Sequence, residues 1–118
     1  MKTRSSPLIV KPRSSPRPRL TAQQFGLIAK ALADPRRMAL LEAIAEQRGE
    51  CPCLRLREQF PVSKATISHH IKELSRAGLI EAHRDGQFLQ CEVRREVLAA
   101  YSAELLRRMR VERRMVRV

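Results

Sequence analysis

No apolar run in this sequence approaches the roughly 20 residues that a membrane-spanning helix needs. The first 20 residues, MKTRSSPLIVKPRSSPRPRL, also lack the continuous apolar stretch of a secretory signal. Cysteine is scarce and odd in number, at three residues, which argues against a disulfide framework and fits a reducing compartment. We therefore expect a cytoplasmic protein that has no membrane partner.

The chain has 118 residues, of which 43% are hydrophobic and 31% charged, so we expect one domain with a modest core. The net charge of +12 is concentrated at the ends. Residues 1–20 carry six Lys or Arg and no acid, residues 107–118 carry six Arg and one Glu, and residues 21–106 are nearly neutral. Basic ends can reach for phosphate or another acidic surface, or they can be solvated tails without a partner.

Composition also sets the expected boundaries of the folded part. Residues 1–20 hold four of the seven prolines and too little apolar area to order themselves, so we expect a flexible basic arm there. Residues 107–118 are expected to form the basic end of a helix or a tail. The domain itself is expected to span residues 21–106.

Capping signals divide the start of that domain into helices. A capping-box pattern at Thr21 predicts a first helix. Asp34 followed by Pro35 predicts the start of a second helix, which Gly49 ends. A short helix follows in PCLRLREQF, with Pro52 at its first position, and ends before the next proline. The apolar residues at helical spacing are Phe25, Ile28, Ala29 and Leu32 in the first helix and Leu41, Ile44 and Ala45 in the second.

A fourth helix and a hairpin complete the pattern. Ser63 can cap the fourth helix, and Gly78 can end it in a left-handed conformation. The stretch LIEAHRDGQFLQCEV has an Asp85-Gly86 turn between two alternating runs, with Leu89, Cys91 and Val93 facing inward, which predicts a β-hairpin. A last helix begins near Arg94. The order predicts a mainly α fold with a small β-hairpin wing, the winged helix-turn-helix arrangement.

Two adjacent histidines lie in the middle of the fourth helix, in VSKATISHHIKELSRAGLI. At 100° per residue they project apart, and a metal pair would need positions i and i+4, so they are poor joint ligands. His70 lies at the edge of the buried stripe made by Ile67, Ile71 and Leu74, and we expect it to pack and hydrogen-bond inside the protein. His69 faces outward. The outward half of this helix is short, polar and weakly basic, as suits a DNA major groove: Ala65, Thr66, Ser68, His69 and Lys72.

The last helix carries an apolar stripe of Leu98, Tyr101, Leu105 and Met109. A domain this small cannot easily cover that surface alone, so we expect a homodimer, which would present paired helices to a palindromic site. The alternative is that the stripe packs only on its own domain.

The combination of IAKALADPRRMALLEAI, VSKATISHHIKELSRAGLI and RDGQFLQCEV resembles the ArsR/SmtB family of winged-helix repressors over about residues 21–106. The resemblance implies a homodimer built from the first and last helices, which adds Phe25 and Ile28 to the dimer contacts. It also implies repression that is released by an inducer. The operator contacts that it implies are Ser63, Lys64, Thr66, Ser68 and His69 on the fourth helix, with Arg84 and Gln87 in the wing.

The cysteines suggest what the inducer could be. Cys51 and Cys53 lie at the start of the short helix, whose positive end favours thiolates and therefore soft-metal binding or oxidation. Arsenic-responsive members of the resembled family carry a Cys-x-Cys pair near this place, which implies As(III) or Sb(III) as a possible inducer. In many winged helices the segment before the short helix pairs with the wing, which could bring Cys51 near Cys91 and make Cys91 a third thiolate. A buried structural thiol is the alternative for Cys91. No cofactor is expected to be required, and an unremarkable helix start remains the alternative for the pair.

Other functional classes fit the sequence less well. The outward face of the fourth helix lacks the convergent acid or nucleophile of an enzyme pocket, and a thiol reductase would need Cys-x-x-Cys on a strand-rich scaffold, so we do not expect an enzyme. A winged-helix regulator or protein-interaction module without a metal effector is the main alternative to an inducible DNA-binding repressor.

Overall fold

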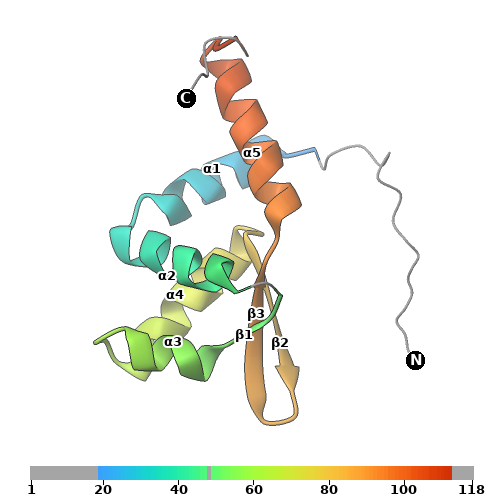
Figure 1. Ribbon diagram of the computed structural model, residues 1–118. Helices are drawn as coiled ribbons and strands as arrows, with labels where there is room; N and C mark the ends of the chain where they lie inside the picture. Colours follow the sequence, from blue (N-terminus) through green and yellow to red (C-terminus); the bar gives the residue numbers. More distant parts are fainter. Residues whose placement is uncertain (1–18, 48, 113–118) are drawn as a thin grey trace, which may run out of the picture.

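The computed structural model describes residues 19–47 and 49–112. The expected flexible arm therefore lies almost wholly outside the described residues, as does the last part of the expected basic tail. Within these described ranges, five helices and three strands follow one another (Figure 1). They are α1 (Ala22–Leu32), α2 (Pro35–Glu46), β1 (Cys51–Pro52), α3 (Cys53–Gln59), α4 (Lys64–Arg76), β2 (Ile80–Asp85), β3 (Phe88–Val93) and α5 (Arg95–Arg108).

The predicted caps begin the helices. Thr21 Oγ1 accepts the Gln24 N–H at 3.0 Å, and Asp34 Oδ1 accepts the Arg36 N–H at 2.8 Å, with Pro35 as the first residue of α2. Each bond satisfies a backbone N–H that the helix itself leaves without an acceptor. Gly78 follows α4 at φ +83°, and the Leu79 N–H donates to the Leu74 carbonyl at 3.0 Å. That pattern is a Schellman motif, which turns the chain directly from α4 into β2.

The sheet is larger than the predicted hairpin, because the two-residue strand β1 pairs with β3 to give the order β1-β3-β2. The turn also differs by one residue. Asp85 pairs with Phe88, so the turn residues are Gly86 and Gln87 rather than Asp85 and Gly86. Gly86 has φ +69°, which is what a two-residue hairpin with glycine first requires.

Three further sequence predictions need correction. Ala29 and Ala45 are not buried; Ala31 and Leu40 take those places in the core. Pro52 is the residue before α3 and not its first residue, because it pairs with β3 as part of β1. For the two alanines, the cause is that helical spacing fixes a face only to within about one residue, and packing against other elements decides the rest.

The core lies where α2, α3 and α4 cover the sheet, and the wing extends from it (Figure 1). Arg95, the first residue of α5, ties that helix to the body by donating from its guanidinium to the Ala45 carbonyl at 3.0 Å, at the carboxyl end of α2. No helix among the described residues has the length and apolarity to cross a membrane. The fully buried large side chains are Ile28, Leu40, Ile44, Leu56, Leu74, Leu79 and Ile80.

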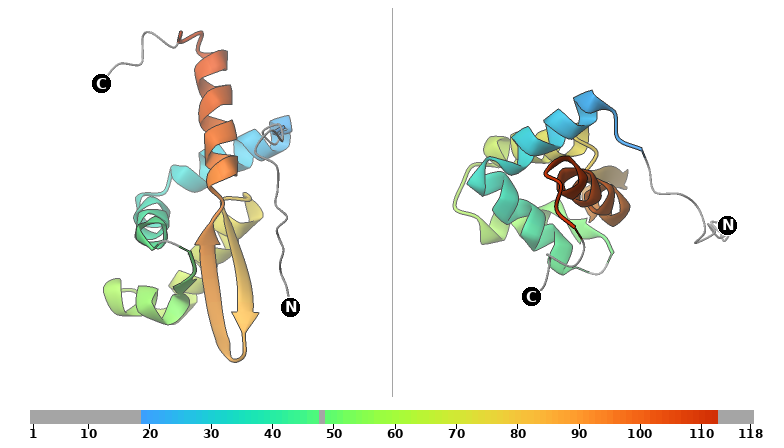
Figure 2. Two further views of the ribbon diagram at one scale, coloured as in Figure 1. Left: turned by 45° about the vertical axis from the view of Figure 1, so that its right-hand side comes forward. Right: turned by 90° about the horizontal axis from the view of Figure 1, so that it is seen from above.

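Helix α5 projects beyond this body, and α1 crosses beside its lower part (Figure 2). Phe25 of α1 and Tyr101 of α5 pack with their ring centroids 4.9 Å apart, and the Arg108 guanidinium lies 3.9 Å from the centre of the Phe25 ring. In the left view of Figure 2 the last turns of α5 rise above the other described elements, and the Arg108 side chain extends from them to Phe25. Beyond this contact, the described part of the fold gives these turns little support.

Candidate nucleic-acid interface

Helix α4 divides into a buried and an exposed face. Ser63 Oγ accepts the Thr66 N–H at 3.1 Å and so fixes the start of the helix. From there Ile67, Ile71 and Leu74 turn into the core. Their spacing leaves the opposite side of the helix in solvent. The predicted outward residues Lys64, Ala65, Ser68, His69 and Lys72 are exposed, as is Ser63.

Thr66 differs from the other predicted contacts because it is half-buried. Its Oγ1 lies 3.0 Å from Ser63 Oγ, so the two hydroxyls satisfy each other at the start of α4. Their first role is therefore to hold the cap, and each retains one further hydrogen-bonding capacity toward an outside partner.

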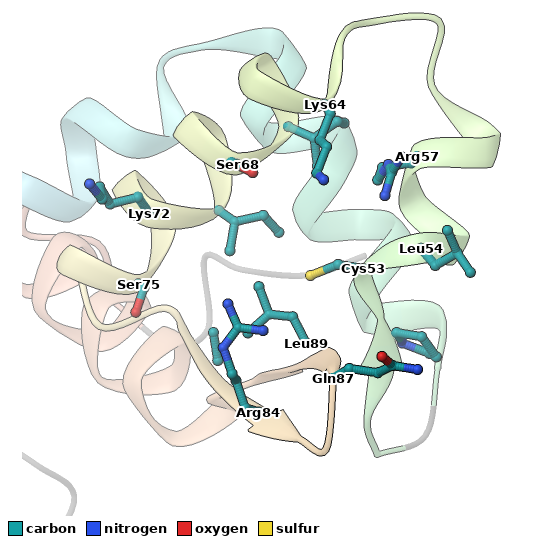
Figure 3. A pocket seen from close by; sticks show the side chains of 14 residues that line it. Cys53, Leu54, Arg57, Lys64, Ser68, Lys72, Ser75, Arg84, Gln87 and Leu89 are labelled. Carbon is teal, nitrogen blue, oxygen red and sulfur yellow. The ribbon is translucent and has the colours of Figure 1, made fainter.

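The exposed face of α4 forms one wall of a groove of about 590 Å³, with α3 and the wing as the other walls (Figure 3). Lys64, Ser68 and Lys72 line it from α4, and Arg84 and Gln87 line it from the wing. These five residues come from sequence positions up to 23 apart, and the turn between α4 and β2 brings them together. Five of the nine predicted contacts thus line one cavity, whereas Ser63, Ala65, Thr66 and His69 do not line it.

Sequence reasoning missed two polar residues of this groove, Arg57 of α3 and Ser75 of α4 (Figure 3). Arg57 faces Lys64 across the groove, whereas Arg55, two residues earlier, is exposed and does not line it. The only signal in the sequence is the pair of arginines in CLRLREQ. Because the helix is short, its spacing alone does not say which of the two points toward α4.

The groove concentrates positive charge. It is lined by Arg57, Lys64, Lys72 and Arg84, and no acidic side chain lines it. Within residues 19–47 and 49–112 none of these four cations forms an ion pair, whereas Arg76 just beyond them pairs with Glu73 at 3.5 Å. Four cations without a protein counter-charge raise the local potential and attract a polyanion.

His70 is buried as predicted, with 6% of its surface exposed, but the predicted internal hydrogen bond is absent. Neither Nδ1 nor Nε2 has a hydrogen-bond partner among the described residues. Burial lowers the pKa of His70 below the usual 6.5, because the charged imidazolium loses hydration; the nearby Asp34 carboxylate acts in the opposite direction. The histidine is therefore held neutral in the folded protein.

This lowered pKa makes folding stability depend on pH. The unfolded chain binds a proton at His70 at a higher pH than the folded chain does, so the free energy of unfolding should fall as the pH drops below about 6.5. The slope from one proton cannot exceed about 1.4 kcal/mol per pH unit. Urea unfolding of the wild type and of His70→Phe between pH 7.5 and pH 5 (about the range in which free imidazole titrates) measures this contribution. Equal slopes for the two proteins would contradict it.

The three cysteines are arranged differently from the prediction. Cys51 lies in β1, is 1% exposed and places its Sγ 3.7 Å from the Pro52 carbonyl oxygen, so it does not begin a helix. Cys53 is the first residue of α3 and is half-buried. Its Sγ points into the groove (Figure 3) and lies 3.2 Å from Sγ of the fully buried Cys91. The close thiol pair is thus Cys53 with Cys91.

The two sulfurs share one hydrogen bond, which shifts their pKa values in opposite directions. A Cys91 thiol that donates to Cys53 stabilises a Cys53 thiolate, so the pKa of Cys53 is lowered and that of Cys91 is raised. Burial raises the pKa of Cys51. Among the described residues no group of three or more His, Cys, Asp or Glu side chains is placed to hold a metal ion. In the wing, His83 Nε2 lies 2.8 Å from a carboxylate oxygen of Glu50.

The predicted dimer residues differ in how far their own protomer covers them. Ile28 has no exposed surface and belongs to the core of the protomer, so it cannot contact a partner; that prediction was wrong. Phe25, Leu98 and Tyr101 are half-buried against their own protomer. Leu105 is half-buried but does not pack against the core cluster, and Met109 is 63% exposed. The apolar end of α5 is therefore open to solvent in the single chain.

Comparison with known proteins places the chain among DNA-binding regulators. A helix-turn-helix domain family matches residues 32–83, from the end of α1 into the wing. The transcriptional repressor SdpR of Bacillus subtilis is 35% identical over 71 residues, which are 60% of this chain and 77% of that protein. The HTH-type transcriptional regulator MJ1325 of Methanocaldococcus jannaschii is 36% identical over 59 residues, 50% of this chain and 65% of its own length.

Solved structures show the same architecture. The ArsR family transcriptional regulator RHA00566 superposes with a TM-score of 0.68 at 27% identity and covers 85% of this chain and 99% of its own. The homodimeric winged helix-turn-helix DNA-binding domain Mb0332 of Mycobacterium bovis superposes with a TM-score of 0.59 at 23% identity and covers 76% of this chain and 83% of its own. The predicted mainly helical fold with a β wing is confirmed.

Proposed function

The chain belongs to the ArsR family of winged helix-turn-helix transcriptional regulators, and on that premise we propose that it is a homodimeric repressor of a palindromic DNA operator. Its homologues are transcriptional regulators and not enzymes. The observation that carries the proposal is the groove between α4 and the wing, with four cations that have no counter-charge in the described part of the chain. Binding to chromosomal DNA would make the cytoplasm its place of action.

The groove and the exposed face of α4 suggest two kinds of DNA contact, to the phosphate backbone and to base edges. Cations reach phosphates at any sequence, whereas short polar side chains allow a helix to approach base edges closely. Ala65, Ser68 and His69 are exposed on the amino-terminal half of α4, which enters the major groove first in helix-turn-helix proteins. We assign base contacts to these residues and to Lys72. The proposed backbone contacts are Arg57, Ser63, Lys64, Thr66, Arg84 and Gln87.

Dimerisation is proposed through α5 and α1. The open apolar end of α5, with Leu105 and Met109, supplies surface that the protomer does not cover. The Phe25–Tyr101 ring pair lies next to it and would extend the contact to α1. A two-fold axis through such an interface presents two α4 helices to half-sites about 34 Å apart, one turn of DNA. The operator is then an inverted repeat.

Selection from a pool of duplexes with random sequence tests this function without knowledge of the natural operator. The proposal predicts enrichment of an inverted repeat whose half-site centres are about 10 base pairs apart. Binding to the selected duplex should exceed binding to a scrambled duplex by about 10³-fold or more. If no sequence is enriched and all duplexes bind equally, the basic surface serves another acidic partner, as expected for a protein-interaction module.

We propose that oxidation of the Cys53 thiol is the signal that releases the protein from its operator. Its Sγ lies in the DNA-facing groove, has a lowered pKa and contacts Cys91 Sγ at 3.2 Å. A peroxide would transfer one oxygen to the Cys53 thiolate, giving a sulfenic acid. The Cys91 sulfur would then attack Cys53 Sγ, and the oxygen would leave as water with the Cys91 proton. The resulting disulfide, about 2.05 Å long, draws the start of α3 toward β3.

The oxidation proposal predicts different results for the two cysteines of the Cys-Pro-Cys sequence. Hydrogen peroxide should weaken operator binding by the wild type by about tenfold, a typical allosteric coupling, and mass spectrometry should show the loss of two hydrogens. Cys53→Ser should abolish both effects. Cys51→Ser should retain both, because Cys51 Sγ is directed at the Pro52 carbonyl oxygen and shares no hydrogen bond with either sulfur of the pair, although Cys51 lies opposite Cys91 in the sheet. A requirement for Cys51 would contradict the assignment.

The metalloid alternative separates from oxidation in the same assay. As(III) or Sb(III) would want three thiolates, so Cys51 would have to turn its side chain toward Cys53 and Cys91. Under reducing conditions, arsenite would then release the operator from the wild type but not from Cys51→Ser or Cys53→Ser. That result would identify metalloid binding, rather than oxidation, as the signal.

A further inference from the structure

A second cavity, of about 390 Å³, lies behind α4, between α2 and the chain that joins α3 to α4. Seven of its nine lining residues are apolar, among them Leu40 of α2, Phe60 and Val62 of the connection, and Ile67 of α4. None belongs to α1, α5 or the wing, so the cavity is separate from the DNA-facing groove except at Ile67, and from the proposed dimer surface. Its volume is within the range of small-molecule sites.

The two polar residues of this cavity are His70 and Arg36. Only 6% of the His70 surface is exposed, and neither ring nitrogen has a hydrogen-bond partner among the described residues. A neutral imidazole carries one N–H donor and one acceptor, and burying both without partners is unfavourable. Both nitrogens are closed to solvent, so the ring would have to turn toward the cavity to exchange this burial for a hydrogen bond with an occupant.

Arg36 gives the cavity its charge. It is exposed at the amino-terminal end of α2, and no ion pair of its guanidinium is found in the described part of the chain. The nearest acid, Asp34, is already engaged: it caps α2 and lies 3.9 Å from the Arg37 guanidinium. The uncompensated charge at this cavity is thus positive.

From these observations we infer that the cavity behind α4 binds a small carboxylate with an apolar body, such as an arylalkanoate. The apolar walls bury the body, the His70 ring donates to one carboxylate oxygen, and Arg36 pairs with the carboxylate at the rim. A purely apolar ligand would leave His70 unpaired. A large ligand would not fit the cavity, and a second negative charge would have no cation other than Arg36 among the lining residues. This inference does not depend on the proposed operator binding.

Phenylacetate and 2-phenylethanol are matched probes, because they share the ring and chain length and differ in charge. Titration of the dimeric or monomeric protein, followed through the histidine ring resonances and by calorimetry, should show saturable phenylacetate binding with a Kd of about 0.1–1 mM. The His70 ring should shift, and that of His83, which lies in β2 and does not line the cavity, should not. The alcohol should bind at least about threefold more weakly.

Variants place the site. His70→Phe keeps the ring volume but removes both nitrogens and should abolish phenylacetate binding, and Ala39→Phe should do so by filling the cavity. Arg36→Gln should weaken binding about three- to tenfold, whereas Arg55→Gln, an exposed arginine that does not line the cavity, should have no effect. Circular dichroism checks that each variant is folded.

Three results would each overturn the inference: no saturable phenylacetate binding, equal binding of the alcohol, or unchanged phenylacetate binding in folded His70→Phe. The titration contains no DNA, so it remains decisive if the operator proposal fails.

Discussion

Replacing Leu105 with glutamate is expected to give a monomer whose operator affinity lies about 100-fold or more below that of the dimer. Leu105 does not pack against the protomer's core cluster, so the substitution should leave the fold of the single chain intact. In the proposed dimer, however, two new carboxylates would be buried near the two-fold axis, which is strongly unfavourable. Each monomer would then bind one half-site alone and lose the gain from linking two sites.

Ala99→Glu is the matched control for this variant. Ala99 is exposed and lies about 120° around α5 from Leu105, so it adds the same charge to the other side of the same helix. Analytical ultracentrifugation should show a monomer for Leu105→Glu and a dimer for Ala99→Glu, and the circular dichroism of both should match the wild type. A Leu105→Glu protein that remains dimeric would show that the open end of α5 is not the interface.

The second large effect is expected from the cations of the groove. The double variant Lys72→Ala/Arg84→Ala removes one cation from α4 and one from the wing. It should lower operator affinity by about 10- to 100-fold at moderate salt. Where both residues contact phosphates, the slope of log affinity against log salt should become shallower by about two. If Lys72 reads a base edge, the slope should change by about one and discrimination against mismatched operators should fall instead.

Arg55→Ala/Arg76→Ala controls for total charge. It removes the same two positive charges from neighbouring exposed positions that do not line the groove, and Arg76 is already paired with Glu73. Anisotropy titrations at several salt concentrations should give a slope and affinity near those of the wild type. Equal losses in the two double variants would mean that the protein attracts DNA by its net charge of +12 rather than by the groove.

The parts of the fold that the sequence predicts well are those determined by local chemistry. Asp34 with Pro35 marks the start of α2, and Gly78 marks the end of α4, because a capping bond or a left-handed residue needs few other contacts to form. The exposed and buried faces of α4 follow likewise from its regular spacing of Ile67, Ile71 and Leu74.

The parts that the sequence does not predict depend on contacts between distant segments. The predicted pairing of the segment before α3 with the wing does place Cys51 opposite Cys91, but the sequence does not show that Cys53 is the residue whose sulfur meets that of Cys91. Arg57 joins the groove only through the orientation of a seven-residue helix. His70 was correctly placed inside, but its lack of a partner depends on which polar atoms surround it, and helical spacing carries no such information.

The most direct test of the account is to map operator DNA onto the protein by the shifts of backbone amide resonances. The account predicts that the largest shifts fall in residues 63–72 of the α4 segment and 84–87 of the wing, with Arg57 between them, and that the buried side of α2 changes little. Large shifts confined to α5 or to the chain ends, with α4 and the wing unaffected, would contradict it.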